Sequence, residues 1–162
     1  MYFVLLIMFF LQATLIDLIK ISHSSPDLGA LFVIFIAIFF GWEAALEAGF
    51  VFGLLKDIYS VDIFGINTFT LAVTGLAAGL LGLKLFRESR MTQVFIVFIF
   101  TLFYFLAHYL ISSALSGIMY IRAPEYLFYS FIPASLYTAL ISVFVFPFLI
   151  NRFGLKENTE YL

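Results

Sequence analysis

Apolar residues along this chain form long runs that only short polar stretches interrupt. Within each run the apolar residues are continuous rather than alternating with polar ones, so the pattern predicts helices and not the strands of a membrane barrel. A helix needs about 17–25 residues to cross a bilayer. Six runs come close to or reach that length, and they cover residues 2–19, 26–42, 44–59, 66–85, 92–112 and 126–150.

The second and third runs are separated only by Gly41, Trp42 and Glu43, which predicts a tight turn and a helical hairpin. The alternative is one long, bent helix. That helix would place Glu43 and Glu47 at mid-membrane, where a charged side chain costs about 2.5–3.5 kcal/mol on insertion scales. We therefore favour the hairpin. At the start of the second run, we expect Ser25 to be the N-cap, Pro26 to take the first helical position and Asp27 to face the positive helix end.

The composition agrees with a membrane-embedded chain. Hydrophobic residues make up 64% and charged residues 11% of the 162 residues, whereas soluble domains carry about 25% charged residues. The sequence thus predicts an all-α integral membrane protein with about six transmembrane helices over residues 1–151 and a polar cytoplasmic tail over 152–162. The first run has no basic residue before it and no small-x-small site after it, so we expect a retained helix rather than a signal peptide.

Lysine and arginine residues give the expected orientation, because cytoplasmic loops are enriched in them. With six spans, five of these residues fall on one side and three on the other, which favours a multi-pass protein with both termini in the cytoplasm. The first group is Lys84, Arg87, Arg90, Arg152 and Lys156, and the second is Lys20, Lys56 and Arg122.

Several functional classes lack support in the sequence. The chain has no cysteine, which excludes disulfides, thiolate nucleophiles and cysteine-based metal sites. The two histidines have no carboxylate at metal-ligand spacing, and no nucleotide-binding loop or catalytic triad order occurs. We expect no catalytic residue, no cofactor, no metal and no nucleic-acid partner, and the lipid bilayer as the surroundings.

Small residues at spacings of four predict close helix packing. One such face comprises Ala45, Gly49 and Gly53 in the third run, and a second includes Gly75 and Gly79 in the fourth. Packing within the bundle is the favoured interpretation, and contact with a partner's helix is the alternative.

Asp57 lies one step of four beyond Gly53, beside Lys56, where the third run ends. We expect this position near the outer interface, with Lys56 extending to water. Asp57 is then either a structural anchor or part of a site. The fourth helix begins after Gly65.

The fifth run carries Tyr104, His108, Ser112 and Ser116 in steps of four. Such a stripe either lines a pocket or a proton path, or forms hydrogen bonds between helices, and the second is the more common case.

Residues 24–69, about a quarter of the chain, resemble the core of the MreD family of rod shape-determining membrane proteins. The resemblance rests on a Pro-Asp-Leu before the second helix, a Gly-Phe-x-x-Gly-Leu-x-x-Asp run in the third and a following turn glycine. Phe64 departs from the Leu or Pro that many members have before that glycine. The matching residues are Pro26, Asp27, Leu28, Gly49, Phe50, Gly53, Leu54, Asp57 and Gly65.

This resemblance implies a non-enzymatic protein of the bacterial cytoplasmic (inner) membrane that acts in cell elongation. It implies association with MreC, a single-span protein with an extracytoplasmic coiled coil. It also implies a link, direct or indirect, to MreB and to RodA with its transpeptidase, and so to peptidoglycan synthesis and cell shape. The signature residues would then lie on an outer surface that a partner contacts. The family further resembles the S-components of energy-coupling-factor transporters in fold.

A vitamin-binding S-component is therefore the main alternative function. It would need polar groups that converge on an outward pocket, and His108, Ser112, Ser116 and Asp57 are a thin set for that purpose. A proton-coupled carrier is a third hypothesis. It would need a mid-membrane acid, and Glu43 and Glu47 fit a cytoplasmic turn better.

Overall fold

The computed structural model describes residues 25–60, 63–82, 90–116 and 127–154, together with Ile7, Phe9, Phe10, Gln12 and Thr14 of the first predicted segment. Every regular element in these parts of the chain is a helix, so the predicted all-helical class is confirmed. The elements are α2 (Leu28–Phe40), α3 (Trp42–Tyr59), α4 (Ile66–Gly82), α5 (Arg90–Ser116), the short π-helix η1 (Leu127–Phe131) and α7 (Ile132–Phe153).

These bounds follow the predicted runs with several differences. Helix α2 is shorter than the predicted 26–42, α3 begins at Trp42 instead of 44, and α7 ends at Phe153 instead of 150. Helix α5 extends beyond the predicted 92–112 at both ends, and the last run divides into η1 and α7. The division lies where Pro133 occupies the first turn of α7. Proline fits a helix start because the amide it lacks would have no helical partner there.

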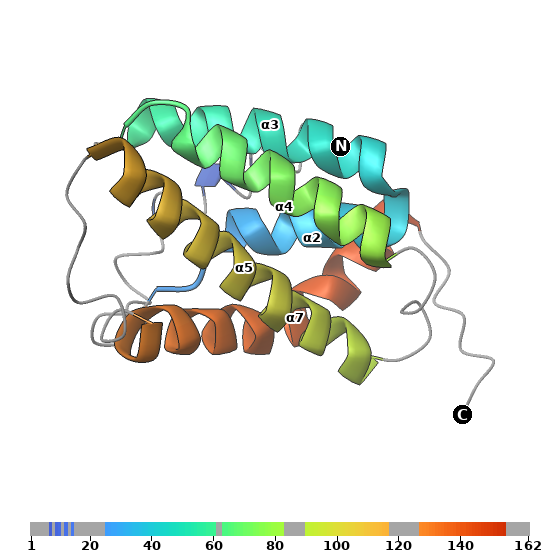
Figure 1. Ribbon diagram of the computed structural model, residues 1–162. Coiled ribbons are helices and arrows are strands. Elements are labelled where there is room, and N and C mark those ends of the chain that lie inside the picture. Colours follow the sequence, from blue (N-terminus) through green and yellow to red (C-terminus); the bar gives the residue numbers. More distant parts are fainter. Residues whose placement is uncertain are drawn as a thin grey trace.

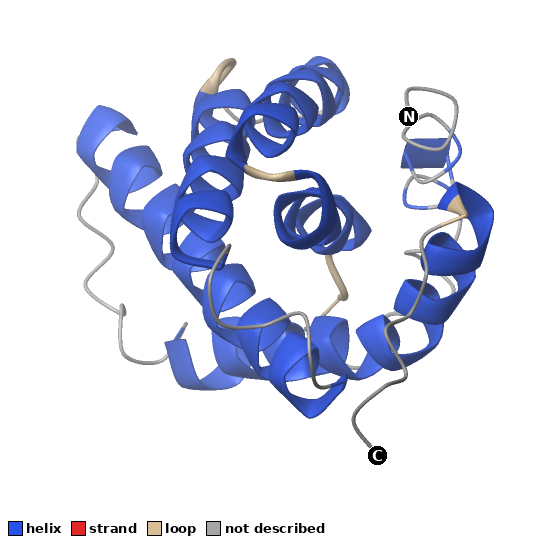
Figure 2. Cartoon of the chain, turned by 90° about the vertical axis from the view of Figure 1, so that its right-hand side faces the viewer, coloured by secondary structure: helices blue, strands red, loops and turns tan. Residues whose placement is uncertain are grey.

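Helix α2 forms the centre of the bundle. All residues from Gly29 to Ile38 are buried, and Figure 2 shows this helix surrounded by the others. A helix buried on every side must be apolar on every side, which the sequence of α2 satisfies. In Figure 1, α3 and α4 lie side by side, and α5 crosses the bundle obliquely.

The predicted tight turn between α2 and α3 is confirmed. Helix α2 ends at Phe40, and α3 begins at Trp42. Gly41 between them has a φ of 92°, a backbone conformation that glycine adopts without a steric penalty. Both Glu43 and Glu47 are exposed near the start of α3.

The glycines of α3 face the backbone of α4. A Cβ added at Gly49 would lie 2.5 Å from the carbonyl oxygen of Leu71, and one added at Gly53 would overlap the Cα of Thr68. These positions therefore exclude any side chain as long as α4 keeps its place.

The glycines of α4 face α3 in return. A Cβ added at Gly75 would lie 2.5 Å from the carbonyl oxygen of Ala45, and one added at Gly79 would overlap the Cα of Trp42. Both small-residue faces predicted from the sequence thus lie in one contact within the chain, between α3 and α4. Backbones that approach this closely gain dispersion contacts along their whole length.

Two helices in the described parts of the chain are long and apolar enough to cross a membrane, Met91–Ser116 and Phe128–Phe153. Leu28–Phe40 and Ile66–Leu81 are shorter apolar helices. The outward side of α5 is a continuous apolar face at steps of three and four, suited to lipid. It comprises Met91, Phe95, Ile99, Phe103, Leu106 and Leu110.

Candidate functional site

Buried polar side chains gather where α2 and α4 begin and α3 ends. We call Asp27, Lys56, Asp57, Asn67 and Tyr104 the polar cluster. Its members come from the residue before α2 and from α3, α4 and α5. All but Lys56 are buried, so each needs a hydrogen-bond partner inside the protein.

Asp27 is the N-cap of α2. Its Oδ1 accepts a hydrogen bond from the backbone amide of Ala30 at 2.9 Å. The expectation that Ser25 takes this role is wrong, because the cap lies two residues later and Pro26 precedes the helix. A carboxylate at the N-cap adds a favourable charge at the positive helix end to the hydrogen bond that a serine would supply.

Gln12 and Thr138 complete the surroundings of Asp27. The Oε1 atom of Gln12 accepts a hydrogen bond from the amide of Gly29 at 2.8 Å, and its Nε2 lies 3.4 Å from Asp27 Oδ1. The amide of Asp27 donates to Thr138 Oγ1 of α7 at 3.0 Å. The start of α2 is thus tied both to the first segment and to α7.

Lys56 forms an ion pair with Asp27 across 29 positions of sequence, with 2.5 Å between Nζ and Oδ2. Its Nζ also donates to the hydroxyl of Tyr104 at 2.9 Å. The expectation that Lys56 extends to water is therefore wrong for its ammonium group, which lies against two buried partners.

Asp57 caps α4 from the end of α3. Its Oδ1 accepts from the backbone amide and the side-chain amide of Asn67, both at 3.0 Å. Its Oδ2 accepts from the backbone amide of Thr68 at 2.9 Å and from the Thr68 hydroxyl. Of the two roles left open by the sequence, this geometry is that of a structural anchor.

Tyr104 connects the two carboxylates. Its hydroxyl donates to Oδ1 of Asn67 at 3.0 Å while it accepts from Lys56. A continuous chain of polar contacts therefore runs from Asp27 through Lys56, Tyr104 and Asn67 to Asp57. It joins the starts of α2 and α4 to the end of α3 and to the middle of α5.

The charges of the polar cluster balance one another. Asp27 and Asp57 supply two negative charges, and Lys56 supplies one positive charge. The positive ends of α2 and α4, each equivalent to about half an elementary charge, face the two carboxylates and supply the remainder. Burial of charges is costly unless they are paired and hydrogen-bonded. Asp27 and Lys56 pair with each other, and Asp57 is hydrogen-bonded at the start of α4.

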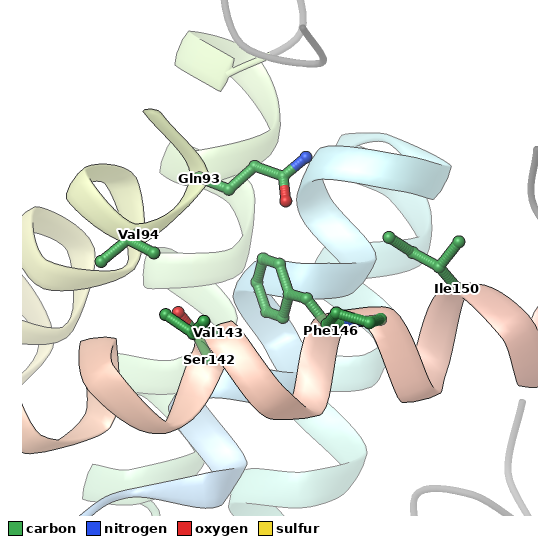
Figure 3. Close-up of a pocket in the computed structure, with 7 residues that line it drawn as sticks. Gln93, Val94, Ser142, Val143, Phe146 and Ile150 are labelled. Carbon is green, nitrogen blue, oxygen red and sulfur yellow. The ribbon is translucent and has the colours of Figure 1, made fainter. Parts of the chain in front are cut away.

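The predicted stripe along α5 does not converge on a pocket. Tyr104 belongs to the polar cluster, and the His108 ring lies 6.1 Å from the Tyr104 ring. Ser112 is half-buried, and Ser116 is exposed and bonds to the carbonyl of Ser113. A small cavity of about 30 Å³ lies elsewhere, between α5 and α7 (Figure 3). Its lining is Gln93, Val94, Ser142, Val143, Phe146, Pro147 and Ile150.

The signature residues also separate in space. Pro26, Asp27 and Asp57 lie inside the bundle rather than on an outer surface, because both carboxylates cap helix starts. Leu28 and Leu54 are half-buried, and Phe50 is exposed on α3. Gly65 has a φ of 97° in the turn before α4, which explains a glycine there.

The sequence analysis did not identify one member of the polar cluster, Asn67, or the two residues that contact Asp27 beside it, Gln12 and Thr138. Gln12, Asn67 and Thr138 are polar residues within apolar runs, and that isolation is the signal that marks functional or structural positions in membrane helices. Asp17, the charged residue of the first run, and Lys20 lie outside the described residues. The described parts of the chain contain no group of three histidine or acidic side chains that could hold a metal ion.

The fold and the polar cluster define a helical membrane protein whose charged residues join its helices to one another. The family model of the rod shape-determining protein MreD matches residues 1–153. The chain therefore belongs to the MreD family, as the resemblance of residues 24–69 predicted, and the family assigns it to the membrane and to the determination of rod shape. Comparisons with curated proteins and with solved structures each find no match.

Proposed function

We propose that this protein is a non-enzymatic subunit of the bacterial cell-elongation machinery. In this proposal it crosses the cytoplasmic membrane six times with both termini in the cytoplasm. It binds an MreC-like single-span protein and, directly or through it, connects to MreB and to RodA with its transpeptidase. The observation that carries the proposal is the family match over nearly the whole chain.

The use of the polar residues supports a role in assembly. Both carboxylates of the polar cluster accept hydrogen bonds from backbone amides at helix starts. Lys56 and Tyr104 form hydrogen bonds to other members of the cluster. Polar groups that bind helix ends in this way stabilise one arrangement of the helices. A membrane subunit needs such a fixed arrangement in order to present a constant surface to a partner.

The alternative of a vitamin-binding S-component receives no support from the cavity in Figure 3. Its volume of about 30 Å³ has room for about two water molecules, since one needs about 10–15 Å³ on this measure. Pockets for small organic ligands measure about 300–1,000 Å³.

Affinity purification of the tagged protein from its native membrane in mild detergent, followed by mass spectrometry, tests the proposal. We expect recovery of a single-span protein with a coiled-coil domain, together with wall-synthesis enzymes. A second tagged multi-pass protein from the same membrane serves as the control for non-specific recovery. Recovery of an ATPase pair with its coupling subunit, or of a bound vitamin, would contradict the proposal.

A further inference from the structure

The two long helices place the polar cluster far from their ends. Tyr104 lies near the middle of the apolar helix Met91–Ser116, so at a rise of about 1.5 Å per residue it is about 18–20 Å from either end. Thr138, which bonds to Asp27, lies ten positions after Phe128 in the helix Phe128–Phe153. That separation corresponds to about 15 Å.

The length of α2 gives a third estimate of the depth of Asp27 in the bilayer, counted from the interface at the other end of this helix. It has 13 residues and so a length of about 20 Å, whereas the hydrocarbon core of a bilayer is about 30 Å thick. If the Gly41 turn lies at one interface, Asp27 at the other end of α2 falls about 10 Å short of the opposite one. All three helices therefore place the Asp27–Lys56 pair within the thickness of the bilayer.

Lys56 is only partly enclosed at this depth. Its side chain retains 24% of its exposure. Charged side chains within a membrane face either the bundle interior or a water-filled space rather than lipid. The Lys56 ammonium contacts Asp27 and Tyr104, and water beside the exposed part of the side chain lowers the desolvation cost of this pair.

The face of α5 that begins at Tyr104 supplies a polar lining toward the helix end. Exposure rises along it in steps of four, from Tyr104 at 2% through the half-buried His108 and Ser112 to the exposed Ser116. The opposite face of the same helix is apolar and includes Leu106 and Leu110, which are 38% and 57% exposed. At 100° per residue these two faces point away from each other.

We propose that water enters the bundle along the Tyr104–His108–Ser112–Ser116 face of α5 and reaches the Asp27–Lys56 pair from the extracytoplasmic side. This solvated path allows an ion pair to persist within the bilayer. The path itself follows from the contacts and exposures above, and its side of the membrane rests on the proposed topology.

The absence of cysteine allows a direct test, because any thiol introduced is the single thiol in the chain. We would make Ser112→Cys and His108→Cys as path variants, with Leu110→Cys and Leu106→Cys as controls of similar depth on the opposite face. Each full-length variant is expressed with its native partners. It is then treated with a membrane-impermeant cationic thiosulfonate in right-side-out and in inside-out vesicles.

We expect the path thiols to react at least about tenfold faster than the controls in right-side-out vesicles, since only the thiolate reacts and lipid suppresses its formation. Ser112→Cys is nearly isosteric, which keeps the test valid if His108→Cys fails to fold. Equal rates on the two faces, reaction only after detergent solubilisation, or reaction only in inside-out vesicles would each overturn the proposal. Partner recovery from the same membranes reports separately on the proposed function.

Discussion

The contact between α3 and α4 differs in kind from the contact between α5 and the segment formed by η1 and α7. In the first, glycines of each helix meet the backbone of the other without an intervening layer of side chains. In the second, large rings separate the backbones. The rings of Phe105 and Phe131 stack at 5.9 Å, and Tyr109 packs against Phe131 at 5.7 Å.

This difference determines which contact can adapt. Side chains can change rotamer and neighbouring chains can repack, so a ring-filled contact absorbs moderate changes of volume. A backbone in contact with a backbone has no such freedom. The α5–α7 side also contains the cavity of about 30 Å³ next to Pro147 (Figure 3). We therefore expect the α3–α4 contact to fail first when either contact is altered.

The largest effect is expected from Gly53→Leu. The new side chain would collide with the backbone of α4 at Thr68 and would separate the helices. Overpacking costs about 1–3 kcal/mol where side chains can yield, and here none can. We expect no detectable folded protein in mild-detergent size-exclusion profiles and no complementation of a deletion strain.

The matched variant in the α5–α7 contact is Ser142→Val, which adds apolar volume next to the cavity there. We expect near-normal accumulation of that variant. Normal growth and partner recovery with Gly53→Leu would contradict this prediction. An equal loss of folded protein in both variants would contradict it too, because the α3–α4 contact would then tolerate change as well as the α5–α7 contact does.

The next effect concerns Asp57, which holds the start of α4 against the end of α3. Asp57→Leu leaves the amides of Asn67 and Thr68 without their acceptor, and each buried unpaired group costs about 1–3 kcal/mol. We expect a loss of about 3 kcal/mol, measured as a lower unfolding midpoint in detergent. Asp57→Asn keeps an acceptor oxygen and should lose about 1 kcal/mol. Equal losses would mean that the charge itself is required.

A smaller effect is expected from Lys56→Met. The change removes the cationic partner of Asp27 and leaves a carboxylate that is supported only by the Gln12 amide and the start of α2. Removing one partner of a fully buried pair costs about 3–5 kcal/mol. Because Lys56 is partly exposed, we expect a loss of about 2 kcal/mol in the same thermal assay. An unchanged midpoint would show that the ion pair contributes nothing to stability.

The smallest effect is expected from Tyr104→Phe, which keeps the ring and removes the hydroxyl that links α5 to α3 and α4. Loss of a single such link costs about 1 kcal/mol. Tyr59→Phe is the control, because the Tyr59 side chain is 72% exposed. A shift with Tyr59→Phe as large as that with Tyr104→Phe would argue against a specific role for the cluster.

The sequence predicted the helices, the α2–α3 turn and the small-residue faces well, because each depends on neighbours within one or two helical turns. The polar cluster was predicted only in part. Lys56 and Asp27 are far apart in sequence, and nothing in the local pattern pairs them. Asp57 caps a helix other than its own, and Gln12 bonds across a gap of 15 positions. Such contacts depend on how the helices pack.

The central claim is that the charges of the polar cluster serve each other and the helix ends. A double-mutant cycle with Asp27→Asn and Lys56→Met tests it, with unfolding midpoints of the wild type, both single variants and the double variant measured in one detergent. Asparagine preserves the N-cap while both charges are removed. We predict that the double variant is more stable than Lys56→Met alone. A double variant whose loss equals the sum of the two single losses would contradict the account.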